Sequence, residues 1–374
     1  MSRLSFLLAG GGTSGHIYPA LAIAEQIQKD YPNARLAFCG TSGGLESKLI
    51  PAAGYPFHTI SARGFPSRPS IDLIRAYRSY AKGRQECREI IKAMRPNAVI
   101  GTGGYVCGPV AAAAADRHVP LLLHEQNAYP GRANRLMARR SQCVCISFRE
   151  AASWFKTKAP VVITGNPVRS IFFNQSYEQA RNTLGWPVDQ PVVLAMGGSL
   201  GARSINEAVL GLSSYLPDQG QADRSQVLRV HLGCGRQHAD EVSGRAKTLP
   251  WLTVYDYIEQ VHLLMAAADL VICRAGAGAC FELAALGKPS ILIPYPFAAG
   301  DHQTANARAL VDAGAALLCR DSDLNSAWLW HQIQYLLKDK EKLSQMGLAA
   351  LNQARPQAAA DICRQLYSFM IQPE

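Results

Sequence analysis

The feature that most constrains the fold is a strand, a glycine-rich loop and a helix that follow one another twice in the chain. The first copy runs from the apolar segment 5–9 through GGGTSG at 10–15 into a stretch with helical periodicity. The second copy runs from the apolar segment 191–196 through GGSLGA at 197–202 into another helical stretch. Two such starts, about one domain length apart, predict two Rossmann-like domains.

The rest of the chain alternates short apolar runs with helical patterns, which predicts α/β domains with parallel, doubly wound sheets. The further predicted strands are 36–39, 98–100, 121–123, 161–164, 230–232, 270–273 and 290–293. Proline favours an extended backbone near Gly165-Asn166-Pro167, so we place the boundary there, with domains at 1–167 and 168–354. Periodicity alone leaves open which domain the last predicted helix packs on.

Positive charge is concentrated in the first half of the chain. Residues 1–167 carry 21 lysines and arginines against 9 aspartates and glutamates, whereas residues 168–374 carry 17 against 19. This asymmetry indicates an anionic partner for the first half, namely nucleic acid, acidic lipid headgroups or a phosphorylated substrate. A merely solvated surface is the alternative. No recognised nucleic-acid motif accompanies the charge, so we expect no nucleic-acid partner.

The cysteines and apolar runs indicate a reduced protein without a membrane span. The ten cysteines include no C-x-x-C motif, and we expect reduced thiols in a cytoplasmic compartment. The first apolar segment lacks the features of a signal peptide and is predicted to be a strand. The longest other apolar run, 106–115, is far shorter than the roughly 20 residues that a spanning helix needs.

The first glycine loop matches G-x-G-x-x-G, but the context argues against a dinucleotide cofactor. A dinucleotide site needs an acid near the end of the second strand to bind ribose hydroxyls. That strand, 36–39, ends in Cys39-Gly40-Thr41 instead. A NAD-dependent oxidoreductase is therefore disfavoured, and we expect no cofactor.

A better nucleotide signature lies in the second half, where strand 270–273 leads into Gly276, Gly278 and a helix carrying Glu282. Amides at a helix start bind phosphates, and a carboxylate in the first turn can accept both ribose hydroxyls. The alternative is that Glu282 only complements the helix dipole.

Together, these and further segments resemble the glycosyltransferase family 28 enzymes of bacteria that add N-acetylglucosamine to undecaprenyl-diphosphate-linked N-acetylmuramoyl-pentapeptide. The matching segments are GGGTSGHIYPALA at 10–22, GTGGYVCGPV at 101–110, HEQNAYPGRAN at 124–134, TGNPVR at 164–169, GGSLGARSIN at 197–206, the run from 255 to 296, and DHQTANA at 301–307. One departure is Ser14, where the family usually has glycine. The resemblance implies the GT-B architecture, in which two Rossmann-like domains face a cleft, and a C-terminal helix from about 355 to 374 that returns to the first domain.

The resemblance also implies contacts to the donor, UDP-N-acetylglucosamine (UDP-GlcNAc). The implied contacts are Thr13, Ser14, Gly15, Asn127, Arg169, Ser199, Ile258, Ala277, Gly278, Ala279, Cys280, Phe281, Glu282 and Gln303. The family inverts the anomeric centre and transfers to the lipid-linked acceptor. A UDP-GlcNAc 2-epimerase or another GT-B enzyme that uses a UDP-sugar is the alternative function.

Inverting transfer needs a base, and two residues are candidates. His16 follows the glycine loop at a helix start, where the helix dipole favours a neutral imidazole that can accept a proton. Glu125 in HEQN at 124–127 is the rival. Asp321-Ser322-Asp323 matches a metal-binding D-x-D motif, but acids are ordinary residues ahead of a helix, and we expect no metal ligand.

The basic segment 63–95 predicts attachment to an anionic membrane. It carries nine cations and a predicted helix after Ser70 with Ile71, Ile74 and Tyr77 on one side. The alternative places this stripe in the core. We expect peripheral attachment to the cytoplasmic face of the plasma (inner) membrane. Proteins of cell-division or elongation complexes are candidate partners.

Overall fold

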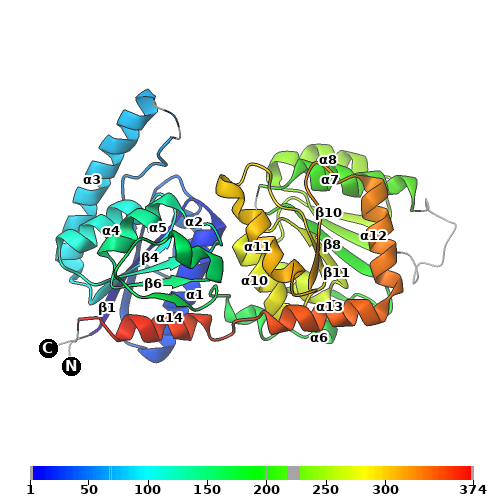
Figure 1. The fold of residues 1–374 in the computed structure, drawn as a ribbon. Coiled ribbons are helices and arrows are strands. Elements are labelled where there is room, and N and C mark those ends of the chain that lie inside the picture. Colours follow the sequence, from blue (N-terminus) through cyan, green and yellow to red (C-terminus); the bar gives the residue numbers. More distant parts are fainter. Residues whose placement is uncertain (1–2, 67, 69, 199, 217–227, 372–374) are drawn as a thin grey trace. The chain divides into compact units, whose positions relative to one another are not determined.

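The computed structural model describes residues 3–66, 68, 70–198, 200–216 and 228–371, and it divides the chain into two compact units (Figure 1). The first unit comprises Met1–Arg169 and Arg355–Glu374, and the second comprises Ser170–Ala354. Each unit contains one parallel sheet with helices on both faces. The predicted fold class, two Rossmann-like α/β domains, is confirmed.

The first unit contains a seven-stranded sheet in the order β3-β2-β1-β4-β5-β6-β7. Its strands are β1 (Ser5–Gly10), β2 (Arg35–Gly40), β3 (Phe57–Thr59), β4 (Ala98–Gly103), β5 (Leu121–Glu125), β6 (Cys143–Ile146) and β7 (Val161–Ile163). All pairings are parallel, so the carboxyl ends of the strands meet at one edge of the sheet. The order changes direction at β1, which places the loop after this strand at the point where ligands bind in such folds.

Helices cover both faces of this sheet because successive side chains of a strand point to opposite faces. Phe6 and Leu8 of β1 belong to one buried cluster, and Leu7 and Ala9 belong to another. The helices of this unit are α1 (Ser14–Asp30), α2 (Glu46–Ala52), α3 (Ile71–Met94), α4 (Cys107–Asp116), α5 (Arg132–Met137) and α14 (Ala358–Tyr367), with short 3-10 helices at Ala138–Arg140 and Arg149–Trp154. Helices α1 and α14 pack in the first cluster, and α3 and α4 pack in the second.

The second unit contains a six-stranded parallel sheet in the order β10-β9-β8-β11-β12-β13. Its strands are β8 (Val192–Met196), β9 (Arg229–Gly233), β10 (Leu252–Tyr255), β11 (Leu270–Cys273), β12 (Ser290–Leu292) and β13 (Ala316–Leu318). Its helices are α6 (Tyr177–Leu184), α7 (Arg203–Leu210), α8 (Ala239–Ala246), α9 (Val261–Ala267), α10 (Ala277–Leu286), α11 (His302–Val311), α12 (Ser326–Lys338) and α13 (Lys340–Asn352), with 3-10 helices at Ser170–Phe172, Gly211–Ser214, Arg236–His238 and Ala299–Asp301. Helices α7, α8 and α12 share one buried cluster with β8 and β9.

The end of the chain returns to the first unit. Ile362, Cys363 and Leu366 of α14 are fully buried in the cluster that contains α1. Tyr367 donates a hydrogen bond from its hydroxyl to Asp30 (2.9 Å) and packs edge-on against Tyr31. The first unit is therefore assembled from both ends of the described chain.

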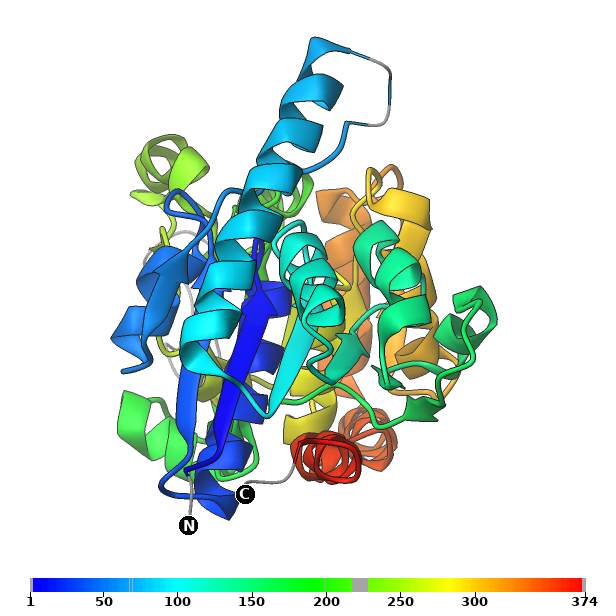
Figure 2. The same cartoon turned by 90° about the vertical axis from the view of Figure 1, so that its left-hand side faces the viewer.

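The N-terminal half of α3 extends away from the rest of the first unit (Figure 2). Ser70 precedes the helix with an extended backbone, as expected of a residue at this position. The stripe of Ile71, Ile74 and Tyr77 is 68%, 55% and 61% exposed, so it does not lie in the core. The ring of Phe65 packs against Tyr77 at 5.1 Å, which places two aromatic side chains at this end of the helix. Among the described helices, none is long and apolar enough to span a membrane.

Truncating Leu366 is expected to destabilise the first unit. Leu366→Ala removes a fully buried side chain between α14 and α1, which costs about 2–5 kcal/mol. Hydrogen exchange of amides in β1 and α1 in increasing urea measures the loss. The control Leu348→Ala alters a side chain that is 60% exposed and should leave protection within about 0.5 kcal/mol of wild type. Equal protection in both variants would show that α14 adds little to this unit.

Candidate active site

The first glycine loop connects β1 to α1 and shapes one end of the site. Gly12 has φ of +85°, a left-handed conformation that suits glycine, and its amide donates to Oε2 of Glu46 at 3.1 Å. Thr13 is extended and exposed, whereas Ser14 is the first residue of α1. Because Ser14 is helical, replacing glycine there costs the loop no strain. The backbone at Thr13–Gly15 begins a helix of 17 residues, whose dipole favours anions.

His16, in the first turn of α1, has a defined tautomer. Its Nδ1 lies 3.2 Å from the carbonyl oxygen of Thr102 and 2.9 Å from Oε1 of Gln126. Both neighbours are acceptors, so Nδ1 carries the proton and donates it to them. In the neutral ring, the other nitrogen, Nε2, therefore keeps its lone pair and can accept a proton.

The Gln126 amide is oriented by Thr102 and by the buried His124. Its Nε2 donates to the Thr102 carbonyl (2.7 Å) and lies 2.9 Å from Nδ1 of His124. On the far side, Nε2 of His124 donates to the carbonyl of Gly165 at 3.1 Å. Burial lowers the pKa of His124 to about 4, so this ring is neutral near pH 7 and its Nδ1 accepts from Gln126. A chain of hydrogen bonds thus runs from Gly165 to His16.

Glu125, the other candidate base, is 1% exposed and fully occupied by hydrogen bonds. Its Oε1 accepts from the backbone and side-chain amides of Asn127 at 3.0 and 3.2 Å. Its Oε2 accepts from the amide of Gly131 (3.0 Å) and from Nδ2 of Asn134 (2.9 Å). These contacts brace the loop from 126 to 134 against the end of β5.

Arg169 lies at the end of the first unit. Its guanidinium sits over the ring of Tyr18 in α1, 4.5 Å from the centroid. This cation–π contact ties Arg169 to the first unit, which ends at this residue.

In the second unit, the nucleotide signature lies where β11 meets α10. Gly276 precedes α10 with an extended backbone, and the ten residues Ala277–Leu286 form the helix. Ala277, Cys280 and Phe281 are buried, while Gly278, Ala279 and Glu282 are partly exposed. Glu282 is the sixth residue of α10, so it lies in the second turn and not in the first turn as predicted. The amides of the first turn and the carboxylate of Glu282 are accessible to a ligand.

The other predicted donor contacts of this unit come from neighbouring loops. Ile258, after β10, packs near Gly233 at the end of β9. Gln303 in α11 accepts from the amide of Tyr295 through Oε1 (2.9 Å), which holds the segment after β12. Both follow carboxyl ends of strands, as α10 does. Ser199, the remaining predicted contact, lies outside the described residues.

The sequence did not reveal the residues that support these groups. Glu46 is fully buried, and its Oε1 accepts from the amide (3.1 Å) and hydroxyl (2.8 Å) of Thr41 in addition to the Gly12 contact. Thr102 holds α1 by donating from its hydroxyl to the carbonyl of His16 at 2.8 Å. Gln126 and Asn134 lie within the segment HEQNAYPGRAN at 124–134, and the match of this segment to the family was the only sequence signal for them. Nothing in the local pattern around Glu46 marks it as buried.

The D-x-D carboxylates are engaged with protein groups. Oδ1 of Asp321 accepts from Nη1 of Arg274 and from the hydroxyl of Ser204, both at 2.5 Å. Asp323 accepts from the Ser322 hydroxyl at 2.9 Å, and it is Asn325 that caps α12. Among the described residues, no cluster of histidine, cysteine or acidic side chains has the geometry of a metal site.

Two Rossmann-like units with helix starts and glycine loops at the carboxyl edges of their sheets are consistent with the GT-B class of nucleotide-sugar enzymes. The model of the glycosyltransferase family 28 N-terminal domain matches residues 6–146, and the model of the C-terminal domain matches residues 192–362. The chain belongs to glycosyltransferase family 28.

Curated relatives match nearly the whole chain. A UDP-N-acetylglucosamine–N-acetylmuramyl-(pentapeptide) pyrophosphoryl-undecaprenol N-acetylglucosamine transferase of Desulforudis audaxviator is 42% identical and covers 95% of this chain and 96% of its own. The enzyme of the same name from Acetivibrio thermocellus is 43% identical and covers 92% of each chain. The residue-level resemblance therefore extends over full-length relatives.

Solved structures agree on the fold. The crystal structure of Acinetobacter baumannii MurG is 30% identical, has a TM-score of 0.74 and covers 98% of this chain and 100% of its own. A putative UDP-N-acetylglucosamine 2-epimerase from Listeria monocytogenes has a TM-score of 0.69 and covers 98% and 96%, but it is only 14% identical. This second likeness is one of fold alone, and the comparisons do not favour an epimerase.

Acid is expected to destabilise the first unit through His124. Its pKa of about 4 in the folded protein lies below the value near 6.5 of an unfolded chain. Between these values the unfolded chain binds more protons, so stability falls as the pH drops, by about 2 kcal/mol at pH 5. Hydrogen exchange of β4 and β5 amides at pH 7.5 and 5 measures this loss. The same loss in His124→Asn would assign it to other groups.

Proposed function

We propose that the protein transfers N-acetylglucosamine from UDP-GlcNAc to the C4 hydroxyl of N-acetylmuramic acid in an undecaprenyl-diphosphate-linked pentapeptide, with inversion. The observation that carries this proposal is the nearly full-length match, at 42% identity, to a relative named for that transfer. A glycine loop with a proton acceptor in one unit and a nucleotide-type helix start in the other support it. The product serves peptidoglycan synthesis.

The two units divide the substrates between them in this proposal. The second unit, Ser170–Ala354, binds the donor through the α10 amides at Ala277–Phe281, with Glu282 accepting the ribose hydroxyls. Ile258 reads the base, and Ser199 and Gln303 are further contacts. The first unit binds the acceptor and the membrane, and contributes Thr13, Ser14, Gly15, Asn127 and Arg169 toward the donor. The support lies in the carboxyl-edge positions of the described members of this set.

His16 is the base in this mechanism. Its Nε2 takes the proton from the C4 hydroxyl while that oxygen bonds to the anomeric carbon of the donor. The bond from this carbon to the diphosphate oxygen breaks, and UDP leaves with the electron pair. The tautomer set by Thr102 and Gln126 supports this role because it keeps the Nε2 lone pair available. The α10 amides stabilise the departing charge without a metal.

Glu125 acts as a positioning residue in the same mechanism. Its four hydrogen bonds already use both carboxylate oxygens, and the side chain is almost fully buried. A base must be within reach of the proton that it removes. We therefore assign Glu125 to holding the loop that presents Asn127 and Gln126.

The first unit attaches to the cytoplasmic face of the inner membrane in this proposal. The exposed Ile71, Ile74 and Tyr77 form an apolar end on α3, and Arg75 and Arg78 lie on the same turns. An apolar face that enters the headgroup layer gains from burial, and each nearby cation adds about 1 kcal/mol with anionic lipids. The ten buried free thiols suit a reducing compartment. Cell-division or elongation proteins are candidate partners there.

Transfer of labelled N-acetylglucosamine from UDP-GlcNAc to a short-chain lipid-diphosphate acceptor, with UDP release followed alongside, tests the activity and the base. His16→Ala should lower kcat by about 100-fold or more, because the proton acceptor is lost. Glu125→Gln should mainly raise the KM for substrates, because its loop loosens. If His16→Ala keeps kcat within about threefold of wild type while Glu125→Gln abolishes turnover, the roles are reversed. NADH turnover or epimerisation without transfer would contradict the function itself.

Membrane attachment is tested by co-sedimentation with vesicles. Ile71→Ser/Ile74→Ser should weaken binding to phosphatidylglycerol vesicles by about tenfold or more, since two apolar side chains no longer enter the headgroups. The control Leu348→Ser alters an equally exposed leucine in the second unit and should bind like wild type. High salt should release the wild type. Equal binding to neutral vesicles would contradict a role of the cations in membrane attachment.

A further inference from the structure

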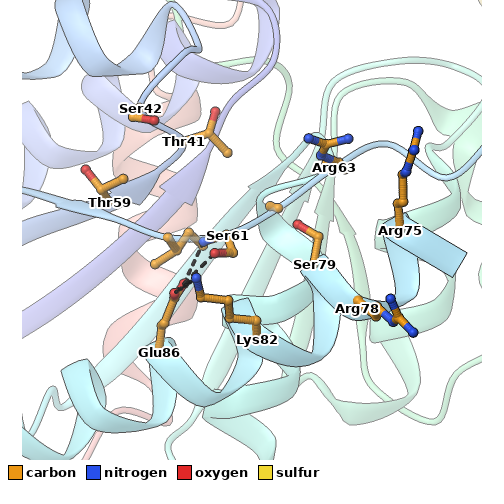
Figure 3. A pocket seen from close by; sticks show the side chains of 12 residues that line it. Thr41, Ser42, Thr59, Ser61, Arg63, Arg75, Arg78, Ser79, Lys82 and Glu86 are labelled. Carbon is orange, nitrogen blue, oxygen red and sulfur yellow. Dashed lines mark hydrogen bonds and ion pairs between the residues drawn. The ribbon is translucent and has the colours of Figure 1, made fainter. Parts of the chain in front are cut away.

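A groove of about 810 Å3 lies in the first unit (Figure 3). Three segments line it, namely the ends of β2 and β3 and one side of α3. The lining residues are Thr41, Ser42, Thr59, Ile60, Ser61, Ala62, Arg63, Arg75, Arg78, Ser79, Lys82 and Glu86. Its walls are hydroxyl-rich and basic, a composition that suits a phosphorylated ligand.

The charges in this groove are poorly balanced. Its single lining carboxylate, Glu86, accepts from the amide (2.6 Å) and the hydroxyl (3.1 Å) of Ser61, and Lys82 lies 3.9 Å away. Arg75 pairs with Asp72 at 3.0 Å. Within the described part of the chain, Arg63 and Arg78 form no ion pair with a carboxylate. An excess of positive charge therefore remains for a ligand.

One side of the groove adjoins the glycine loop. The Thr41 hydroxyl donates to Glu46, and the same carboxylate accepts from the Gly12 amide. The hydroxyl oxygens of Thr41 and Tyr105 are 3.3 Å apart, which links this wall to the loop after β4. The groove and His16 thus lie along the carboxyl edge of a single sheet.

The other side of the groove lies on α3, next to its apolar end. Arg75 and Arg78 alternate along the helix with Ile74 and Tyr77. The side chains of Ile74 and Tyr77 are exposed. A ligand in the groove is therefore placed between a proton acceptor at one side and a surface suited to lipid at the other. That position fits the junction between a sugar and a lipid chain.

We propose that this groove binds the diphosphate of a polyprenyl-diphosphate-linked sugar acceptor, a site separate from the donor site. The inference rests on the proposed function. A diphosphate carries more than one negative charge and many acceptor oxygens, which matches four cations and several hydroxyls better than a single carboxylate would. An arginine guanidinium group can donate two hydrogen bonds to two oxygens of one phosphate. Phospholipid headgroups share this phosphate chemistry and are the competing occupant.

Direct binding of farnesyl diphosphate to the full chain tests the site without requiring turnover. Arg63→Ala/Arg78→Ala should weaken binding by about tenfold, since two charge-assisted contacts are lost, and should leave UDP binding unchanged. The matched control Lys29→Ala/Lys92→Ala removes two exposed cations of the same unit outside the groove, and should bind as wild type does. Both pairs are exposed, so folding is expected to survive. Equal affinities in the two double variants would overturn the proposal.

Two further measurements separate the sources of phosphate. Inorganic pyrophosphate should displace farnesyl diphosphate from the wild type. Loss of Arg78 from the apolar end of α3 should weaken binding of the groove variant to phosphatidylglycerol vesicles by only about fivefold, because Ile71, Ile74 and Tyr77 still enter the headgroups. A groove variant that loses vesicle binding but keeps farnesyl diphosphate affinity would assign the groove to phospholipid instead. In the transfer assay, the groove variant should raise the KM for the acceptor by about tenfold with kcat unchanged. Binding without any transfer would refute the proposed function while leaving the groove intact.

Discussion

The arrangement of the first unit's site depends on one buried amide, the side chain of Gln126. It donates to the Thr102 carbonyl and to His124, and its oxygen accepts from His16. These contacts connect β4, β5 and α1, so a single side chain aligns three elements at the sheet edge. A reversed amide would place its oxygen against the Thr102 carbonyl at 2.7 Å, which is repulsive. The orientation of Gln126, and with it the tautomer of His16, is therefore fixed by the backbone.

Buried carboxylates hold the loops around this amide. Glu46 accepts from the amides of Gly12 and Thr41, and Glu125 accepts from those of Asn127 and Gly131. Amide donors stabilise a carboxylate that is removed from water, and the carboxylate in turn satisfies amides that no strand or helix pairs. Loops at a sheet edge need such fixed acceptors if they are to present a ligand site without large rearrangement.

The sequence predicted the parts of the fold that have strong local patterns. The strands around the two glycine loops and at 270–273 were found because each is an apolar run bounded by glycine or polar turns. Strands β3, β10 and β13 were missed, and each is a short strand at the edge of its sheet. Strand β6 was missed because the paired cysteines in 143–146 were considered only as thiols. In the site, the sequence named His16 and Glu125 as candidates for the base, but it did not predict the different hydrogen-bond partners of the two side chains. The partners of Glu125 lie on a loop whose closure depends on tertiary packing, which no local pattern encodes.

The acidic side chains around the first unit's site accept hydrogen bonds from loop residues, and this affects how the positive charge of the unit is balanced. Near the glycine loop of the first unit, Glu46 and Glu125 are buried and saturated, and in the groove Glu86 is held by Ser61. These acids stabilise loops, and among the described residues Arg63 and Arg78 of the groove form no ion pair with a carboxylate. Among the side chains held at this sheet edge, His16 presents Nε2, while its Nδ1 is held by Thr102 and Gln126. In the proposed mechanism, the negative charge of an acceptor bound near these cations and amide donors favours the proton transfer to His16.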